Sequence, residues 1–411
     1  MSSSERRSTA DASSAVRVVK RRPKNRKSQI AGVAADAFGA LGYHAVSMED
    51  IAAKVDVSAA ALYRHYPSKY ALFREVVLGL GTRLHNAVEL PAEASDWDAE
   101  ERIDWLLRSI LTVTVANRQS GALYRWEDRY LRGDDRRGLR RQMDSVHAAI
   151  TVPLAELRPA LDDTDRATLA FAALAVIGSI TDHHATLPAR QLERLLIDAC
   201  WNVLRADLPP AGDGSADPPA QLEIPVTFKH ELLLKEAVRL FYERGYPEVG
   251  IDEIASAAGL PASGVYRYFR SKADLLTAAF RRAADRVSAA IPVAVAQSPD
   301  ARHALQILVE SYVAGAFEES ELTFVYYAEI GNVPPEERST LRNIQRLNVE
   351  EWARLLAEVR PELSAGEARF LVHAALGLVV DIGRFLHFHN SVASQRRVQQ
   401  LMLRVLFGSK A

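Results

Sequence analysis

The chain contains two copies of one sequence pattern, and this repeat limits its possible folds more than any other feature. The phrase ALYRHYPSKYAL, at 61–72, returns as GVYRYFRSKADL at 264–275. Much later, LRPAL at 157–161 corresponds to VRPEL at 359–363. Because the blocks keep the same order, we predict two related folding units in tandem, each of about 180 to 200 residues.

Two segments lie outside the copies. The segment 206–227, ADLPPAGDGSADPPAQLEIPVT, is rich in Pro, Gly, Ser and Asp, and such a composition predicts a linker because it cannot bury a core. The arm 1–27 carries nine Lys or Arg and two acidic residues, although the whole chain has a formal net charge of −1. This arm is either a solvated disordered tail or a segment that lies along nucleic-acid phosphates or in a minor groove.

Apolar residues recur at the spacing of a helix, and strand patterns are nearly absent. Ile30, Ala34, Ala37 and Phe38 fall on one face of a helix. Later segments, such as ATLAFAALAVIGSI at 167–180, are apolar most of the way round, as buried bundle helices are. The predicted fold class is therefore all-α.

Composition argues against several functional classes. No apolar run reaches the ~18 residues that a membrane span needs, and no apolar stretch follows the N-terminal charges as it would in a secretory signal. A single cysteine, Cys200, allows neither an intrachain disulfide nor a cysteine-built zinc site. The chain shows no phosphate-binding loop, dinucleotide-binding glycine pattern or nucleophile elbow. We therefore expect a cytoplasmic protein that is not an enzyme, contacts no membrane and uses no cofactor.

Each copy begins with a pattern of three short helices and the start of a fourth. Gly42 and Gly245 suit the left-handed residue that closes a first helix, and Ser47 can cap a second helix, with Asp50 three residues on. The turn DVS at 56–58 then leads into the helix AAALYRH. This is the spacing of a helix-turn-helix, whose second helix enters the major groove of DNA.

On these residues the chain resembles the TetR family of transcriptional regulators, over 28–76 and again over 231–279. The matching positions are Ser47, Ile51, Ala52, Ser58, Leu62, Tyr63, Tyr66 and Lys69 in the first copy, and Gly250, Ile254, Ala255, Val265, Tyr266, Phe269 and Lys272 in the second. The resemblance implies that each copy has an N-terminal three-helix helix-turn-helix domain and a C-terminal helical bundle for ligand binding and dimerisation. The implied boundaries are a basic arm at 1–27, helix-turn-helix domains at 28–76 and 228–280, bundles at 77–205 and 281–408, and a linker at 206–227.

The resemblance also implies roles in binding double-stranded operator DNA. Tyr63 and Tyr266 would donate hydroxyl groups to phosphates. Lys69 and Lys272 would hold phosphates as point charges, and Ser47 would bind one at the start of the second helix. The groove-facing residues and the arm complete the predicted set with Ala59, Ala60, Arg64, His65, Ser263, Arg267, Tyr268, Arg21, Arg22 and Lys24.

The sequence departs from the family pattern where specificity is decided. Asp56 replaces the usual glycine of the turn, although Asp tolerates the left-handed region. The recognition helices begin with AAA at 59–61 and ASG at 262–264, where only Ser263 can hydrogen-bond a base. We therefore expect readout to depend on the arginine of each YR dipeptide, on thymine methyl groups, on DNA shape and on the arm.

The second half of each copy carries aromatic residues that could contact a ligand. LYRWEDRYL, at 123–131, is predicted to place Trp126 and Tyr130 on one helical face. The candidate pocket residues are Trp105, Trp126, Glu127, Tyr130, Phe324, Tyr327 and Glu329. Ordinary aromatic core is the alternative. The arm, the two domains and WEDRYLRGDDRR together are similar to tandem TetR regulators of actinobacteria that control lipid uptake and degradation operons, which implies an apolar or acyl-type effector such as a lipid or acyl-CoA.

Two histidine pairs are the remaining candidates for a functional site. His183-His184 and His387-x-His389 could suggest a metal site. However, adjacent histidines on a helix point ~100° apart, and no carboxylate lies at helical ligand spacing. We interpret these residues as satisfied or interfacial histidines and expect no metal site.

These observations predict a ligand-responsive repressor that binds operator DNA and is released by its small-molecule effector. Two alternatives stay open: a DNA-binding protein whose bundles only dimerise, and a regulator in which one helix-turn-helix is structural. We expect the two copies to pair within one chain, as an intramolecular pseudo-dimer, through the late helices near 166–204 and 366–407. A further homodimer is left open.

Overall fold

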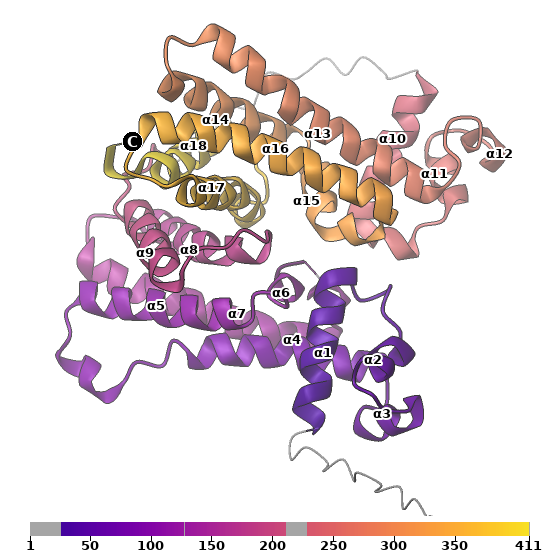
Figure 1. Ribbon diagram of the computed structural model, residues 1–411, viewed down its shortest axis with the longest axis horizontal. Coiled ribbons are helices and arrows are strands. Elements are labelled where there is room, and N and C mark those ends of the chain that lie inside the picture. Colours follow the sequence, from indigo (N-terminus) through magenta and orange to yellow (C-terminus); the bar gives the residue numbers. More distant parts are fainter. Residues whose placement is uncertain (1–25, 127, 211–227, 411) are drawn as a thin grey trace, which may run out of the picture.

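The computed structural model describes residues 26–126, 128–210 and 228–410, and within these residues the regular structure is entirely helical (Figure 1). The first copy contains α1 (Arg26–Leu41), α2 (Met48–Lys54), α3 (Ala59–His65), α4 (Lys69–Asn86), η1 (Ala92–Asp96), α5 (Ala99–Ala116), α6 (Ala122–Trp126), η2 (Asp128–Tyr130), α7 (Gly133–Leu157), α8 (Asp163–Gly178), η3 (Ser179–Thr181) and α9 (Ala189–Leu204). The second contains α10 (Lys229–Arg244), η4 (Tyr246–Glu248), α11 (Ile251–Ala257), α12 (Ala262–Val265), α13 (Lys272–Gln297), α14 (Ala301–Glu318), α15 (Ser320–Glu329), η5 (Ile330–Asn332), α16 (Pro335–Val359), α17 (Ala365–Phe385), α18 (Val392–Phe407) and η6 (Gly408–Lys410). The predicted all-α fold in two tandem units is confirmed. Of the helices described, none has both the length and the apolar character that crossing a membrane requires.

Local side-chain chemistry sets the helix boundaries near the start of each copy. Ser47 Oγ accepts a hydrogen bond from Asp50 N at 3.0 Å, and the Asp50 carboxylate accepts one from Ser47 N at 3.0 Å, which is the predicted capping box. Gly42 and Gly245 follow the first helix of each copy with positive φ values of 81° and 83°. Asp56 takes φ 55° in the turn before α3, as its tolerance of the left-handed region predicted.

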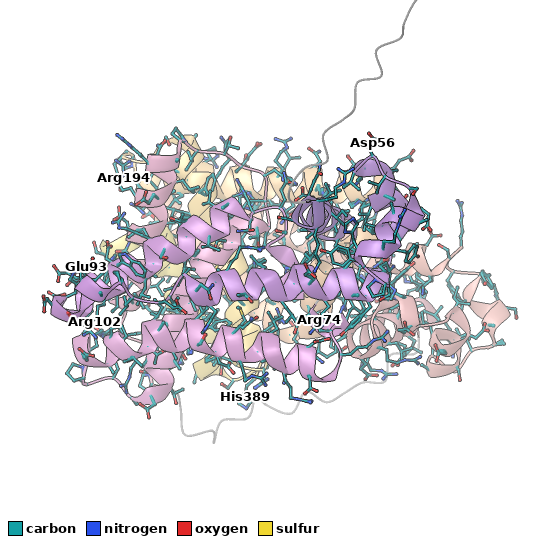
Figure 2. All side chains as sticks on the ribbon, turned by 90° about the horizontal axis from the view of Figure 1, so that it is seen from below. Asp56, Arg74, Glu93, Arg102, Arg194 and His389 are labelled. Atoms are coloured by element: carbon teal, nitrogen blue, oxygen red, sulfur yellow. The ribbon has the colours of Figure 1, made fainter. Side chains whose placement is uncertain are left out.

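The short helices at the start of each copy enclose a small core of their own. We call these regions the first reader domain (28–76) and the second reader domain (228–280). Phe38 and Leu62 are fully buried in the first, and Val265 is fully buried in the second. Both reader domains lie at the same end of the molecule (Figure 1). Figure 2 shows Asp56, in the turn of the first reader domain, at the opposite end from Glu93 and Arg194.

One apolar core runs through the bundles of both copies. It is built mainly by α8 and α9 of the first copy against α17 and α18 of the second (Figure 1). Leu169, Leu196, Leu371 and Leu401 are each fully or almost fully buried in it. The predicted pairing of the copies through their late helices is confirmed. Burial of apolar surface is the dominant favourable term in such packing. The contact between the copies is therefore part of the hydrophobic core that stabilises the chain.

The start of the predicted linker differs from the expectation. Ala206 is fully buried, and its carbonyl accepts a hydrogen bond from Arg158 Nη1 at 2.7 Å. Arg397, on α18 of the second copy, donates a hydrogen bond to the carbonyl of Pro209 at 2.9 Å. Residues 206–210 are therefore held on the bundles, because arginines of both copies satisfy their carbonyls. The rest of the predicted linker, 211–227, lies outside the described residues.

Candidate nucleic-acid interface and the core between the copies

The first reader domain presents a short recognition helix to solvent. Ser58 caps α3 by accepting a hydrogen bond from Ala61 N at 3.2 Å. Leu62 anchors the helix in the core, so the face that carries Tyr63, Arg64 and His65 points outward. The ring of Tyr63 is 45% exposed although tyrosine is a large partly apolar side chain. Ala59 and Ala60, at the helix start, present only methyl groups.

The second reader domain departs from the first because its recognition helix is shorter. α12 covers Ala262–Val265, whereas α3 covers seven residues. Pro261 offers no side-chain cap, and Gly264 has a low helix propensity, which explains the early end of α12. The predicted contact residues Tyr266, Arg267 and Tyr268 therefore lie in the turn that follows, all exposed.

Ser263 is also exposed, on α12 itself. Tyr266 and Tyr268 are 58% and 38% exposed, so both rings are available to a partner. The second reader domain thus presents the same residue types as the first on a different backbone. Matching residue types in the two copies does not predict this difference between α3 and α12.

Lys69 and Lys272 occupy a structural position rather than the free one expected of a phosphate ligand. Lys69 Nζ donates hydrogen bonds to the carbonyls of Tyr43 at 3.0 Å and Val46 at 3.0 Å, with His44 at 3.4 Å. Lys272 Nζ donates to the carbonyl of Tyr246 at 2.7 Å and to a second loop carbonyl. Desolvation by burial lowers the pKa of both lysines. The carbonyls after the first helix of each copy therefore accept the hydrogen bonds of the ammonium groups.

Ser47 is similarly engaged, because its hydroxyl donates to Asp50 Oδ2 at 2.6 Å. A phosphate contact by this hydroxyl requires that bond to break. The arm residues Arg21, Arg22 and Lys24 and the pocket candidate Glu127 lie outside the described residues. Of the described candidate contact residues, the tyrosines and arginines of both reader domains are exposed and are not engaged in this way.

The aromatic pocket candidates come together across the two copies. The ring of Trp126 stacks on Tyr327, with centroids 5.2 Å apart and planes 23° apart, and meets Phe324 at 6.1 Å. Trp126 is only 4% exposed. A cavity of about 90 Å³ lies beside the group, lined also by the C-terminal end of α1. The first copy thus contributes Trp126, and the second copy contributes Phe324 and Tyr327. The sequence of either copy alone could not predict that these rings meet.

Two of the predicted pocket residues are placed differently from the expectation. Trp126 ends α6, and Tyr130 belongs to the separate η2, so they do not share a helical face. Tyr130 packs on Tyr43 and His44, at centroid distances of 5.6 and 4.6 Å, and lines the same cavity as Trp126. Trp105, on α5, pairs with Trp97 at 6.3 Å and is no part of the Trp126 group.

Glu329, at the end of α15, is buried and connects the first copy to the second reader domain. It is 1% exposed, and its Oε1 pairs with Arg129 of the first copy at 2.8 Å. The same oxygen accepts a hydrogen bond from Tyr246 N at 2.8 Å, and Asn332 donates to Oε2 at 2.7 Å. Burial raises the pKa of Glu329, against the lowering effect of Arg129. The residue is therefore a structural bridge that also lines the cavity beside Trp126.

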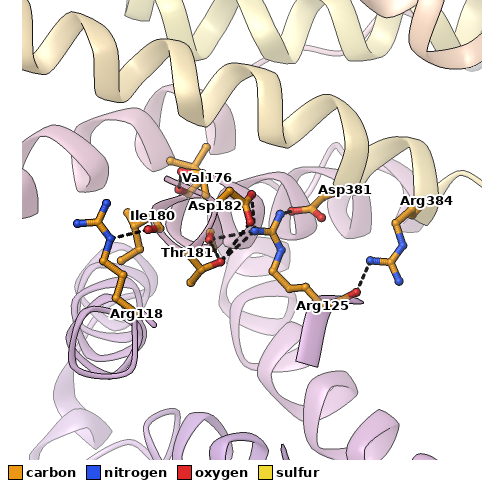
Figure 3. A network of polar contacts seen from close by, with 10 residues as sticks. Arg118, Arg125, Val176, Ile180, Thr181, Asp182, Asp381 and Arg384 are labelled. Atoms are coloured by element: carbon orange, nitrogen blue, oxygen red, sulfur yellow. Dashed lines mark hydrogen bonds and ion pairs between the residues drawn. The ribbon is translucent and has the colours of Figure 1, made fainter. Parts of the chain in front are cut away.

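A charged network that the sequence did not indicate lies in the core between the copies (Figure 3). Arg125 Nη1 pairs with Asp182 at 2.7 Å, and its Nη2 pairs with Asp381 of the second copy at 2.5 Å. Arg384 donates to the carbonyl of Arg125 at 2.7 Å and lies over the ring of Trp126. Burial raises the pKa of Asp182, although Arg125 opposes this. An acidic residue inside an otherwise apolar helix, such as Asp381 in α17, is the signal that could have revealed the network.

His183 lies at the interface between the copies, which was one of the two interpretations made from the sequence, whereas His184 is exposed. His183 stacks on His373 of the second copy, and Arg118 Nη2 donates to the carbonyl of His183 at 2.7 Å. Desolvation by burial lowers the pKa of His183 to about 2 and that of His373 to about 4. No group of three or more metal-ligating side chains is found among the described residues.

Comparison with known proteins gives these features a context. A family described as bacterial regulatory proteins of the tetR family matches residues 30–76 and again 233–279, which are the two reader domains. The HTH-type transcriptional activator FasR of Mycolicibacterium smegmatis is 35% identical over 80 residues, which are 20% of this chain and 36% of FasR. The transcriptional regulator AcuR of Cereibacter sphaeroides is 44% identical over 45 residues, which are 11% of this chain and 20% of AcuR.

The matches therefore span about a third of one curated relative and a fifth of the other. Among solved structures, a TetR-family transcriptional regulator from Bordetella parapertussis 12822 superposes with a TM-score of 0.41 at 19% identity. The superposition covers 44% of this chain and 96% of that one.

Proposed function

We propose that this chain, a TetR-family protein with two TetR units in tandem, is a DNA-binding transcriptional regulator that reads one operator with both reader domains. The observation that carries the proposal is the position of the two reader domains, at one end of a single fused core (Figure 1). Each of them turns a Tyr-Arg pair toward solvent, Tyr63-Arg64 and Tyr266-Arg267. Such a protein acts in the cytoplasm, where bacterial operator DNA lies.

The exposed side chains divide into two kinds of DNA contact. The hydroxyl groups of Tyr63 and Tyr266 donate to phosphates and position the protein without reading sequence. Arg64 and Arg267 reach base edges, where a guanidinium can contact guanine at two atoms. Lys69 and Lys272 contribute indirectly, because their hydrogen bonds hold the loop after the first helix of each reader domain.

The proposed effector is an apolar or acyl-type molecule that enters the Trp126 group. Small-molecule sites usually have volumes of about 300–1,000 Å³, whereas the cavity beside Trp126 has about 90 Å³. A ligand must therefore separate the rings to enter. Because the cavity is lined by Phe38 to Ala45 of the first copy and by Tyr327 to Asn332 of the second, this separation would move α1 relative to α15. Movement of α1 displaces the first reader domain, which is the proposed route to release from DNA and to repressor action.

A mobility-shift assay tests both parts of the proposal. DNA from upstream of the protein's own gene should be retarded by the full chain, and a long-chain acyl-CoA should release it. If no upstream or control DNA is bound specifically at low salt, the regulator proposal is wrong. If DNA is bound but acyl-CoA and free fatty acid leave the complex intact, the alternative of bundles that only pair the copies is favoured. Retention of full affinity by a Tyr266→Phe/Arg267→Ala variant would favour a purely structural second reader domain.

Tryptophan fluorescence tests the effector site independently of DNA. The chain has five tryptophans, so the signal of Trp126 must be isolated by substitution. An acyl ligand should quench the parent protein and a Trp97→Phe control alike, and should lose its effect in Trp126→Phe. A ligand that raises the melting temperature of the parent protein should do so through mass action on the folded state.

A further inference from the structure

A large cleft separates the two reader domains on the side of the helical bundles, and arginines dominate its lining. Its volume is about 860 Å³, within the range of small-molecule sites. The lining comes from the loop after α1, the segment before and along the start of α7, the C-terminal end of α10 and the end of α17. The arginines are Arg129, Arg132, Arg136, Arg140, Arg244 and Arg384.

Among the described residues of the lining, these six arginines face three carboxylates, those of Asp128, Glu243 and Glu248. Glu243 is already paired, at 2.9 Å, with Arg239, and Arg244 is paired, at 2.6 Å, with Glu253. Neither of these partners lines the cleft. The cleft therefore has an excess of positive charge between protein walls. Such an arrangement focuses the electrostatic potential and raises the local concentration of anions.

Several guanidinium groups in the cleft have unused hydrogen-bond donors. Nε and Nη1 of Arg129 are buried and have no acceptor among the described residues, although its Nη2 pairs with Glu329. Arg136 Nε is 3.8 Å from Asp128 Oδ2, beyond hydrogen-bonding distance. In the described part of the chain, neither Arg132 nor Arg140 forms an ion pair with a carboxylate. A buried donor without an acceptor is costly, so ligand oxygens would be stabilised here.

We propose that this cleft binds a small molecule that carries two or more phosphate groups. The planar fork of arginine matches phosphate oxygens and binds them with two parallel hydrogen bonds. A single phosphate would leave most of the cleft unfilled, whereas a polyphosphate or a nucleotide spans several arginines. Tyr242 also lines the cleft and is 45% exposed, which offers a ring face to a nucleoside base. The cleft adjoins the Trp126 group, because Phe324 and Arg384 contact Trp126 and also line the cleft. The other five arginines of its lining lie outside that group, and the inference goes beyond the proposed function.

The direction of the first helices places this cleft away from the recognition residues. The Tyr66 hydroxyl, just after α3, donates to the carbonyl of Lys27 at the N-terminal end of α1. The cleft instead contacts Tyr43 and His44, beyond the C-terminal end of that helix. A helix of 16 residues is roughly 24 Å long. α10 repeats the arrangement, because Tyr268 lies near His230 at its start and the cleft lies at its end. This geometry favours a free small molecule over the DNA backbone.

An occupant of the cleft would contact both reader domains at once. His44 comes from the loop of the first, and Tyr242 and Arg244 come from the second. A polyanion held between them fixes their separation, and that separation sets the spacing at which two half-sites can be read. Binding in the cleft should therefore change DNA affinity, and by linkage DNA should change the affinity for the polyanion.

Calorimetric titration of the full chain, without DNA, tests the site directly. The probes are inorganic tripolyphosphate and, separately, ATP, at a fixed ionic strength near 0.15 M. One site per chain is expected. Arg136→Gln/Arg140→Gln should lower the affinity at least about tenfold, because charge-assisted hydrogen bonds are lost at a partly desolvated site. Arg346→Gln/Arg354→Gln is the matched control, since it removes the same charge from exposed positions on α16 and should leave binding unchanged.

Tighter binding of ATP than of tripolyphosphate would support a nucleotide ligand, and equal binding would support recognition of the phosphates alone. The proposal is overturned if neither probe binds, or if the α16 control loses as much affinity as the cleft variant. It is also overturned if the cleft variant binds tripolyphosphate normally but loses affinity for random-sequence duplex DNA. That last result would make the cleft a DNA-backbone contact.

Discussion

His183 and His373 stack face to face across the boundary between the two copies, with ring centroids 4.0 Å apart and planes 8° apart. A second stack, Phe171 on Phe385, has centroids 4.7 Å apart and planes 20° apart. Phe171 and His373 occupy equivalent positions in α8 and α17, and His183 and Phe385 are likewise equivalent, because each pair is separated by 202 residues. The two stacks are therefore related by the pseudo-two-fold symmetry of the copies, and only one of them can titrate.

The histidine stack predicts a loss of stability in weak acid. His183 Nδ1 accepts a hydrogen bond from Ala185 N at 3.2 Å, and Arg118, Arg369 and His184 add nearby positive charge. Desolvation by burial, together with these charges, lowers the pKa of both histidines in the folded state, to about 2 for His183 and about 4 for His373. The unfolded chain takes up protons as the pH falls below about 6.5 while the folded chain does not. The free energy of unfolding should then decrease by up to about 1.4 kcal/mol per pH unit for each histidine, down to about pH 4 for His373 and about pH 2 for His183.

Urea unfolding at pH 7 and pH 5 measures this effect. His183→Phe/His373→Phe should recreate the phenylalanine stack of the other side and remove this part of the pH dependence. Carboxylates elsewhere contribute equally to parent and variant, so the difference between the two slopes is the informative quantity. Identical slopes would show that the histidine pair is protonated as readily in the folded state as in the unfolded state.

Lys69 and Lys272 are predicted to stabilise the reader domains rather than to bind DNA phosphates through their charge. Lys69→Met leaves the carbonyls of Tyr43 and Val46 without their donor, at a cost of about 1–3 kcal/mol. Lys272→Met should have a similar effect in the second reader domain. Denaturant unfolding should show both losses, while the salt dependence of DNA binding stays as in the parent. Unchanged stability with a log–log salt slope flattened by about one unit would instead restore the phosphate role inferred from the sequence.

Arg64 and Arg267 are predicted to read sequence. Both are exposed, Arg64 on α3 and Arg267 just after α12. Among the described residues, Arg64 makes only a long hydrogen bond, 3.4 Å, to the carbonyl of Ala60. Replacing either arginine by Ala should relax base preference at one position, worth about 1–3 kcal/mol. Tyr63→Phe is the comparison, because loss of a phosphate contact should weaken all sequences alike. Binding of a randomised operator library, followed by sequencing, separates the two patterns. An unchanged preference in Arg64→Ala would exclude that arginine from base readout.

Local rules explain why much of the reader domains could be predicted from the sequence. The capping box of Ser47, the positive φ of Gly42 and the left-handed Asp56 depend on residues within a few positions of each other. The end of α12 before Tyr266 was missed because Tyr266 matches Tyr63 in type, while Gly264 differs from its counterpart in helix propensity. Matching residue types alone does not reveal such a difference in helix length.

The contacts between the copies could not be predicted, because they depend on how two separate helical units dock. Nothing in the LYRWEDRYL segment indicates that Trp126 would stack on Tyr327, or that Arg125 would pair with Asp381. The pairing of the late helices could be predicted because the segment 167–180 is apolar most of the way round and because the resemblance to the TetR family implies a dimer-forming pair of late helices. The partners of individual polar groups inside that interface could not, since each depends on the register of the docked helices.

Arg125 is predicted to be the most sensitive polar residue of the core between the copies. Arg125→Met removes the cation that two buried carboxylates share, and breaking a buried ion pair typically costs about 3–5 kcal/mol. The triple variant Arg125→Met/Asp182→Asn/Asp381→Asn should regain most of this stability. Because burial already raises the pKa of Asp182, the single variant should suffer less at pH 5 than at pH 7. Thermal unfolding of the single and triple variants at the two pH values measures this. Equal melting temperatures for the parent and Arg125→Met would show that the network contributes nothing to the fold.

The last prediction concerns the number of chains on one operator. Two reader domains already lie at the same end of a single chain, and their recognition helices differ, with seven residues in α3 and four in α12. One chain should therefore protect an asymmetric operator with two unlike half-sites, about one helical turn or a multiple apart. A protease site introduced between 211 and 220 leaves the carbonyl contact of Arg397 with Pro209 in place and converts an intramolecular pairing into a bimolecular one. DNA affinity at nanomolar protein should then fall, and it should recover at micromolar protein, because covalent linkage supplies a millimolar-scale effective concentration that the cut chain lacks. Sedimentation of the uncut chain on its operator should give one chain per site. An obligate dimer of chains on a perfect palindrome, with each first reader domain paired to another first reader domain, would contradict this model.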